Sequence, residues 1–225
     1  MVTPGQVLHA KPRLRAKHIL FFVLGLMTLY ILYYDEGFFL HHDSDDWKFF
    51  YPVRIKIFFH AIGGAIALVV GALQFSTRLR ERRPALHHWL GRTYLAGVLV
   101  AAPVAVYLGF THALAVMATG TAVQSSLWVL TTLMAIRAAR NRNFELHQQW
   151  AIRSYSVTLL FVANRIMLDV PIVKPTTDVG AERLAWILMV CALVVSQLII
   201  DKQQLSMRQS TTQAHGFPES PSKPW

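Results

Sequence analysis

The chain has 225 residues, of which 54% are hydrophobic and only 15% are charged, and its mean hydropathy is +0.37. A soluble domain carries charge on nearer a quarter of its residues, so the composition excludes an ordinary soluble protein and favours an integral membrane protein. The net charge of +10 would suit nucleic acid. However, the basic residues lie in alternate loops between apolar runs, so we interpret them as topology signals and expect no nucleic-acid partner.

Six apolar stretches approach the length of about 20 residues that a helix needs to cross a hydrocarbon core of roughly 30 Å. In chain order they are 18–34, 55–75, 89–110, 113–136, 150–170 and 184–200. The first follows a basic segment but ends without a small-residue cleavage site, so we interpret it as a membrane anchor and not as a signal peptide. The sequence therefore predicts an all-α fold, a polytopic membrane bundle of six transmembrane helices.

The charged loops predict the orientation of this bundle. Lys and Arg gather in the N-terminal tail, around Arg80, around Arg140 and after Asp201, whereas the intervening loops are acidic or nearly uncharged. Because loops rich in Lys and Arg stay in the cytoplasm, we expect both termini to be cytoplasmic. The predicted organisation is a basic tail (1–17), a six-helix membrane domain (18–204) and a disordered cytoplasmic tail rich in Ser, Thr, Gln and Pro (205–225).

Polar residues recur at helical spacing inside the second, third and fifth stretches. Such groups are costly in a bilayer, so they usually face the bundle interior and often mark function. An inner layer contains Gln74, Arg78, His87, His88, Arg92, His147 and Arg153. An outer layer contains His60, His112, Arg165 and Asp169. Arg165 and Asp169 are four residues apart and can form an ion pair on one helix face. Small residues accompany these groups on the second stretch, where we expect Gly64, Ala67 and Gly71 to face the bundle.

These residues resemble a family. The segments His60-x2-Gly63-Gly64, Gly71-x2-Gln74, His87-x3-Gly91-Arg92-x-Tyr94 and His147-x2-Trp150-x2-Arg153-x-Tyr155, with Arg165 beyond, are similar to the domain of unknown function 2306 family of bacterial predicted membrane proteins. The resemblance covers roughly 55–169. It implies a multi-pass protein of the bacterial inner membrane and implies no established activity. The chain departs from the family pattern at His88, where Arg is usual, and at Ala151, where Met is usual.

The most specific hypothesis from these residues is a b-type haem, which imidazoles from facing helices hold within membrane bundles. His87, or its neighbour His88, would pair with His147 in the inner layer, and His60 with His112 in the outer layer. Gly91 would leave room for the macrocycle, and Arg92 or Arg153 would neutralise a propionate. This arrangement is similar to that of di-haem cytochrome b561 and would make the chain an electron-transfer protein.

Two other classes of function stay open. A proton-coupled transporter or channel would use the same polar layers, and a structural scaffold would use them only to hold its helices together. The loop His41–Asp46 offers metal donors, but we interpret it as a flexible acidic loop. The chain has no Ser-His-Asp arrangement, phosphate loop or zinc-protease motif, so hydrolase and nucleotide-driven functions have no support. The expected partner is the lipid bilayer, with a homo-oligomer or a redox partner left open.

Overall fold

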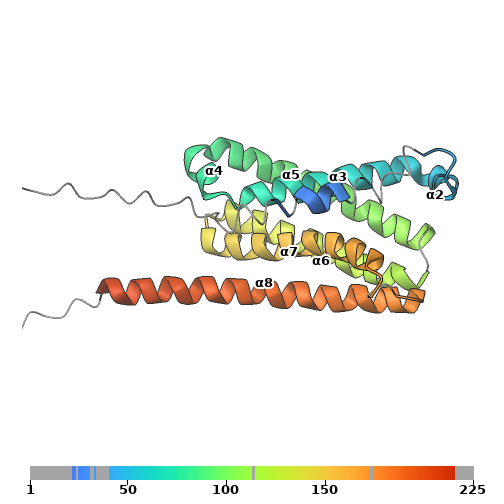
Figure 1. The fold of residues 1–225 in the computed structure, drawn as a ribbon. Helices are drawn as coiled ribbons and strands as arrows, with labels where there is room; N and C mark the ends of the chain where they lie inside the picture. Colours follow the sequence, from blue (N-terminus) through green and yellow to red (C-terminus); the bar gives the residue numbers. More distant parts are fainter. Residues whose placement is uncertain are drawn as a thin grey trace, which may run out of the picture.

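A computed structural model of the chain describes residues 22–23, 25–30, 33, 41–112, 115–172 and 175–215, with the side chains at 46, 115–116, 169, 208 and 210–215 left undescribed. All regular structure in this part of the chain is helical, which confirms the predicted all-α fold. The elements, shown in Figure 1, are α2 (Asp45–Phe50), a 3-10 turn η2 (Tyr51–Val53), α3 (Arg54–Gln74), α4 (Thr77–Arg82), α5 (Pro84–Thr111), α6 (Ala115–Arg140), α7 (Phe144–Asp169) and α8 (Asp178–His215).

Local sequence signals explain where these helices begin. Ser76 caps α4, because its hydroxyl accepts a hydrogen bond from the Leu79 amide. Pro84 begins α5 at a position where its missing N–H would have no helical partner. Arg142, with a φ of 57°, turns the chain between α6 and α7, and the Asn143 side chain then caps α7. The helix-to-helix turns are therefore short, and successive long helices run antiparallel.

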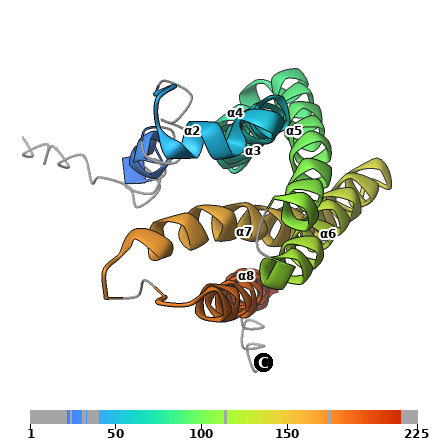
Figure 2. The same cartoon turned by 90° about the vertical axis from the view of Figure 1, so that its right-hand side faces the viewer.

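The long helices pack mainly against their neighbours in sequence: α3 against α5, α5 against α6, α6 against α7, and α7 against α8. Figure 2 shows the bundle end-on, with α7 between α3 and α8. The backbones of α3 and α5 approach each other closely, and a Cβ at Gly63 would lie 2.7 Å from the Gly97 carbonyl oxygen. Two facing glycines let the backbones meet, as in small-residue membrane interfaces. Gly63 makes this contact and Gly64 does not, since a Cβ at Gly64 would meet nothing within 4 Å. The expectation for Gly64 was therefore wrong.

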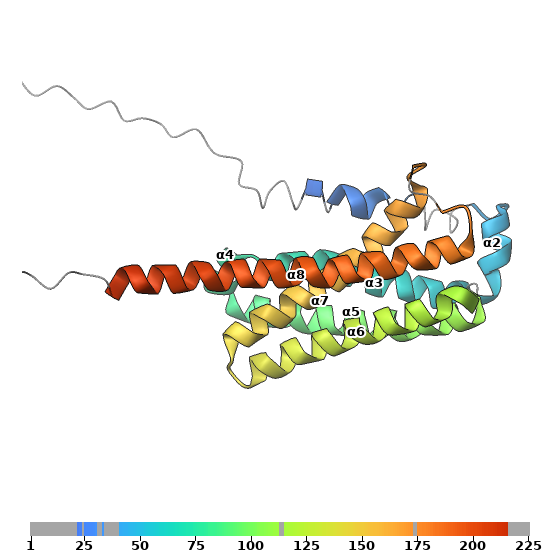
Figure 3. The same cartoon turned by 90° about the horizontal axis from the view of Figure 1, so that it is seen from below.

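The charged loops lie at opposite ends of the bundle (Figures 1 and 3). One end has α4, the turn between α6 and α7, and the C-terminal part of α8. It contains the arginines around Arg80 and Arg140. The other end has α2 and the beginning of α8, with Asp45 and Asp178. We call these the basic end and the acidic end.

Among the described residues, three helical segments are long and apolar enough to cross a membrane: Trp47–Gln74, Pro84–Thr111 and Asp178–Met207. Helices α6 and α7 have 26 residues each, which is about 39 Å and enough to span, but they are more polar. The first predicted span, 18–34, lies largely outside the described residues. The fold thus shows a helical protein with three apolar candidate spans.

Helix α8 is longer than the sequence predicts. It continues without a break to His215, through 205–215, where we expected a disordered tail. Its 38 residues extend about 57 Å, well beyond a hydrocarbon core of roughly 30 Å. The physical reason is local, because no Gly or Pro interrupts the chain between Gly180 and Gly216. Figure 1 shows α8 projecting past the other helices at the basic end.

Candidate functional site

A network of hydrogen-bonded side chains occupies the centre of the bundle, where α5, α6 and α7 meet. The Tyr94 hydroxyl shares hydrogen bonds with Ser154 Oγ (2.8 Å) and Thr158 Oγ1 (2.9 Å). Trp128 Nε1 donates to Thr158 Oγ1 at 2.9 Å and, more weakly, to the Tyr94 hydroxyl at 3.3 Å. Thr132 Oγ1 lies 2.7 Å from Ser154 Oγ. All five side chains are at most 9% exposed, so they form one polar cluster enclosed in apolar surroundings. We call it the central network.

Helical spacing brings these residues together. Ser154 and Thr158 are four apart on α7, and Trp128 and Thr132 are four apart on α6, so each pair faces Tyr94 from one side. Thr132 Oγ1 also lies 2.7 Å from the Trp128 carbonyl oxygen, to which it can donate within its own helix. Interhelical hydrogen bonds of this kind bind helices together in a medium that offers no water.

The α6 half of the central network was not predicted from the sequence. The predicted layers consist mainly of ionisable residues, and α6 has none before Arg137. A usable signal was present, because Trp128 and Thr132 lie one turn apart and therefore on the same face of α6.

Three residues of the predicted inner layer come together at the level nearest the basic end. His147 Nδ1 donates to the Ala135 carbonyl oxygen of α6 at 2.9 Å. Gln74 Nε2 donates to the His87 carbonyl oxygen at 3.2 Å. His87 lies within electrostatic range of His147, and within the described part of the chain its buried Nδ1 has no hydrogen-bond partner. Because a carbonyl only accepts, His147 carries a proton on Nδ1, and its Nε2 is then the atom that can accept a proton or bind a metal.

The two arginines of this layer that were expected to neutralise a propionate lie elsewhere. Arg92 is exposed. Arg153 is directed at α8, where it donates to Gln197 Oε1 at 2.9 Å, and its guanidinium lies 4.9 Å from the Trp150 ring centre. The room expected beside Gly91 is occupied by Gln74, whose Oε1 would be 3.7 Å from a Cβ there.

In the outer layer, His60 is half-buried and its Nδ1 donates to the Ala101 carbonyl oxygen at 2.9 Å. His112 lies eleven residues beyond Ala101 at the end of α5, about 16 Å further along the helix axis. The expected pairing of His60 with His112 is therefore wrong, because two axial ligands of one haem must share a depth. Arg165 is exposed near the outer end of α7. Its ion pair with Asp169 stays a prediction, since the Asp169 side chain lies outside the described residues.

An apolar layer separates His60 from the central network. Val98, Ala67 and Ala101 are each 0% exposed and belong to one buried cluster with Tyr94. On α5, Val98 lies between Tyr94 and Ala101, whose carbonyl oxygen accepts from His60. Tyr94 lies seven residues from both His87 and Ala101 on α5, which places it about 10 Å from each histidine level.

The loop 41–46 is more structured than expected. The Ser44 hydroxyl caps α2 by accepting from the Trp47 amide at 3.1 Å, and Lys48 pairs with Asp45 at 3.3 Å. The His42 ring packs against Trp47 with centroids 4.4 Å apart. Among the residues that the structure describes, no group of three His, Cys, Asp or Glu side chains is placed to hold a metal ion. The Asp46 side chain is not among them.

Comparison with known proteins gives a family and no activity. No curated protein and no solved structure is detectably similar to the chain. The family model described as "Predicted membrane protein (DUF2306)" matches residues 57–201, which include α5, α6, α7 and most of α3 and reach into α8. The match extends beyond the region 55–169 on which the resemblance rested, and it covers the central network and every histidine of the two layers. The chain therefore belongs to the DUF2306 family of predicted membrane proteins.

Proposed function

We propose that this protein translocates protons across the bacterial cytoplasmic membrane. The observation that carries the proposal is the central network, a buried set of hydroxyl groups in the middle of the bundle with histidines on both sides of it. A hydroxyl group both donates and accepts, and a histidine can take a proton on one ring nitrogen and release it from the other. Chains of such groups inside membrane bundles are the usual route for protons.

In this proposal an apolar layer prevents the leakage of protons. His147 and His87 receive protons at the basic end, and His60 faces the acidic end. The layer of Val98, Ala67 and Ala101 interrupts the polar path between the central network and His60. Because protons do not cross such a layer unaided, translocation requires a rearrangement of α3 against α5. Their contact at Gly63 and Gly97 has no intervening side chain, so little has to be displaced when these helices slide.

The proposal includes six transmembrane spans with both termini in the cytoplasm. The alternation of the basic and acidic ends supports it, because loops rich in arginine stay inside. The low hydropathy of α6 and α7 is compatible with spanning, since several of their polar residues face inward. Thr132 is 1% exposed, Ser154 1% and Thr158 3%, and all three are hydrogen-bonded within the bundle. Helices that line a polar core are less apolar than those that face lipid.

Proton flux into proteoliposomes tests the proposal. The purified chain is reconstituted in vesicles containing a pH-sensitive dye, and a potassium diffusion potential drives protons inward. We expect a flux clearly above that of empty vesicles and at least a tenfold loss in His147→Gln and in His60→Gln. His112→Gln is the matched control, because this half-buried side chain contacts Thr111 and Phe49 at the end of α5 and lies far from the central network. A parent protein no more permeable than empty vesicles would refute the proposal.

A b-type haem held by His87 and His147 is the second candidate function, and one observation favours it. Metal-binding histidines usually donate their other N–H to a backbone carbonyl, as His147 does to Ala135. His147 Nε2 and the His87 ring would hold the iron, and the haem would supply one-electron transfer. The fit is incomplete, because Gln74 occupies the space beside Gly91 and would have to move.

An absorption spectrum separates the two candidates. Haem binding requires a Soret band and a reduced α-band in protein purified from haem-replete cells. His147→Ala should remove or reshape those bands, and His112→Ala should leave them intact. A colourless protein excludes the redox function. A colourless protein that also carries no proton flux would leave the central network with the role of a scaffold alone.

A further inference from the structure

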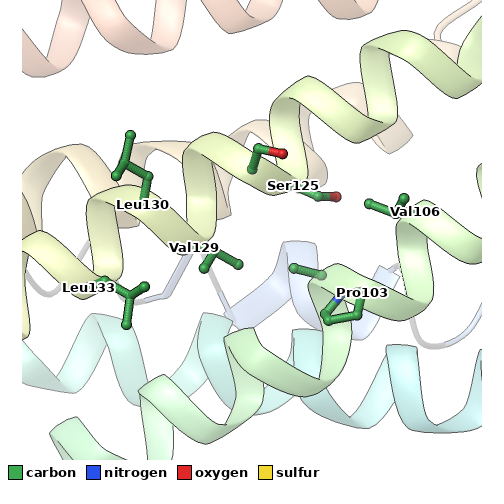
Figure 4. A pocket seen from close by; sticks show the side chains of 8 residues that line it. Pro103, Val106, Ser125, Val129, Leu130 and Leu133 are labelled. Atoms are coloured by element: carbon green, nitrogen blue, oxygen red, sulfur yellow. The ribbon is translucent and has the colours of Figure 1, made fainter.

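The lipid-facing side of the bundle has an apolar groove between α5 and α6, away from the central network. It encloses about 380 Å³ and is lined by Ala102, Pro103, Val106, Ser125, Ser126, Val129, Leu130 and Leu133. Figure 4 shows Pro103 and Val106 on α5 across from Ser125 and Val129 on α6. The volume lies within the range of small-molecule sites, which are mostly apolar with a few polar groups.

Two serines line this groove, and the hydroxyl of Ser125 is the one available to a ligand. Ser125 is 2% exposed, and within the described part of the chain its Oγ has no hydrogen-bond partner. The neighbouring hydroxyls are satisfied: Ser126 donates to the Ala122 carbonyl oxygen at 2.7 Å, and Thr131 donates to that of Leu127, also at 2.7 Å. A buried hydroxyl without a partner is unfavourable, so Ser125 is a donor that an incoming acceptor would satisfy.

The depth of the groove in the membrane restricts which molecules can bring a hydrogen-bond acceptor to Ser125. Ser125 lies ten residues along α6, about 15 Å from its outer end, and Pro103 lies eight residues before the end of α5, about 12 Å in. A hydrocarbon core is roughly 30 Å thick, and the ester carbonyls of membrane lipids lie at its borders. A lipid acyl chain could fill the groove, but its ester could not reach Ser125. The acceptor must belong to a molecule that dissolves wholly in the hydrocarbon.

We propose that the α5–α6 groove binds a lipophilic carbonyl compound of the quinone class, whose ring carbonyl accepts a hydrogen bond from Ser125. Val106, Val129 and Leu133 pack against the ring and its alkyl tail, and the open side of the groove admits the ligand from the bilayer. This inference does not rest on proton translocation, since the groove and the central network share no residue.

Calorimetric titration of the detergent-solubilised protein with a short-tailed benzoquinone tests the proposal. Val106→Phe fills the groove, so the heat measured with this variant gives the background that arises when the quinone partitions into the micelles. We expect saturable binding to the parent and a loss of about 3- to 10-fold in affinity in Ser125→Ala, the effect of one neutral hydrogen bond. Thr131→Val is the matched control, because it removes a hydroxyl of α6 that is already bonded within its own helix and does not line the groove. Its affinity should equal that of the parent.

Two further measurements show whether the Ser125 hydroxyl itself recognises the ligand. Ser125→Ala without ligand should unfold at the same temperature as the parent or higher, because it removes an unsatisfied group, so weaker binding would not reflect a damaged fold. An alkylbenzene with the same tail and no carbonyl should bind equally to parent and Ser125→Ala. No saturable quinone binding, or equal quinone affinity in Ser125→Ala and the parent, would overturn the proposal. A parent dimer that Val106→Phe dissociates would also overturn it, because a second copy would then occupy the groove.

Discussion

Gly71 lies on α3 where the helix passes the aromatic rings of Tyr155 and Tyr94, and the substitution Gly71→Ala examines that contact directly. An alanine Cβ would lie 2.6 Å from Tyr155 Cδ2 and Cε2 and 2.9 Å from Tyr94 Cε2. Neither ring can move freely. The Tyr155 hydroxyl donates to the Leu68 carbonyl oxygen at 3.0 Å, and the Tyr94 hydroxyl belongs to the central network. The added methyl group must therefore displace an anchored ring.

The expected magnitude has three parts. Overpacking a well-filled interior destabilises by about 1–3 kcal/mol. Displacing a ring weakens at least one hydrogen bond, which contributes roughly another 0.5–1.5 kcal/mol. Replacing glycine by alanine inside a helix offsets about 0.5–1 kcal/mol of this loss. We expect Gly71→Ala to lower the free energy of unfolding by about 0.5–4 kcal/mol, the sum of the first two ranges less the offset.

The same substitution at Gly64 is the matched control. Gly64 lies two turns earlier on α3, and a Cβ there would meet nothing within 4 Å. Only the helix-propensity gain applies, so Gly64→Ala should be neutral or stabilising by up to about 1 kcal/mol. Both variants are compared by thermal unfolding in detergent and by titration with a denaturing detergent. Equal stability of Gly71→Ala and Gly64→Ala would refute the packing of α3 against Tyr155 and Tyr94.

Two other predictions concern the central network and the topology. Tyr94→Phe keeps the ring but removes a hydroxyl that three buried groups contact. It should therefore lower the free energy of unfolding by about 1–3 kcal/mol. An unchanged unfolding midpoint would mean that these contacts contribute no net stability. Reporter fusions at Trp225 and near Arg140 should be active only as cytoplasmic reporters, and a fusion near Asp178 only as an external one. A periplasmic signal at Trp225 would mean an odd number of spans.

The amino-acid sequence alone was sufficient for the all-α fold and for most of the described helices. Long apolar runs are a local property, because each run must satisfy its backbone within one helix in a medium without water. For that reason 55–75 and 89–110 coincide with much of α3 and α5. Boundaries were less certain, and α8 continues past 204 because the residues that end a helix, Gly216 and Pro218, come later than the change in polarity.

The grouping of side chains depended on the tertiary structure. Helical periodicity correctly placed His87 and His147 at the basic end and His60 toward the acidic end, but it could not give the rotation or offset of one helix against another. The approach of Gly63 to Gly97 sets the offset of α3 on α5 and directs His60 at Ala101, away from His112. The packing of α7 against α8 likewise places Arg153 beside Gln197, and the packing of α6 against α7 places Trp128 beside Thr158. Which polar groups meet depends on contacts between residues distant in sequence, and a single-helix pattern contains no information about its neighbour.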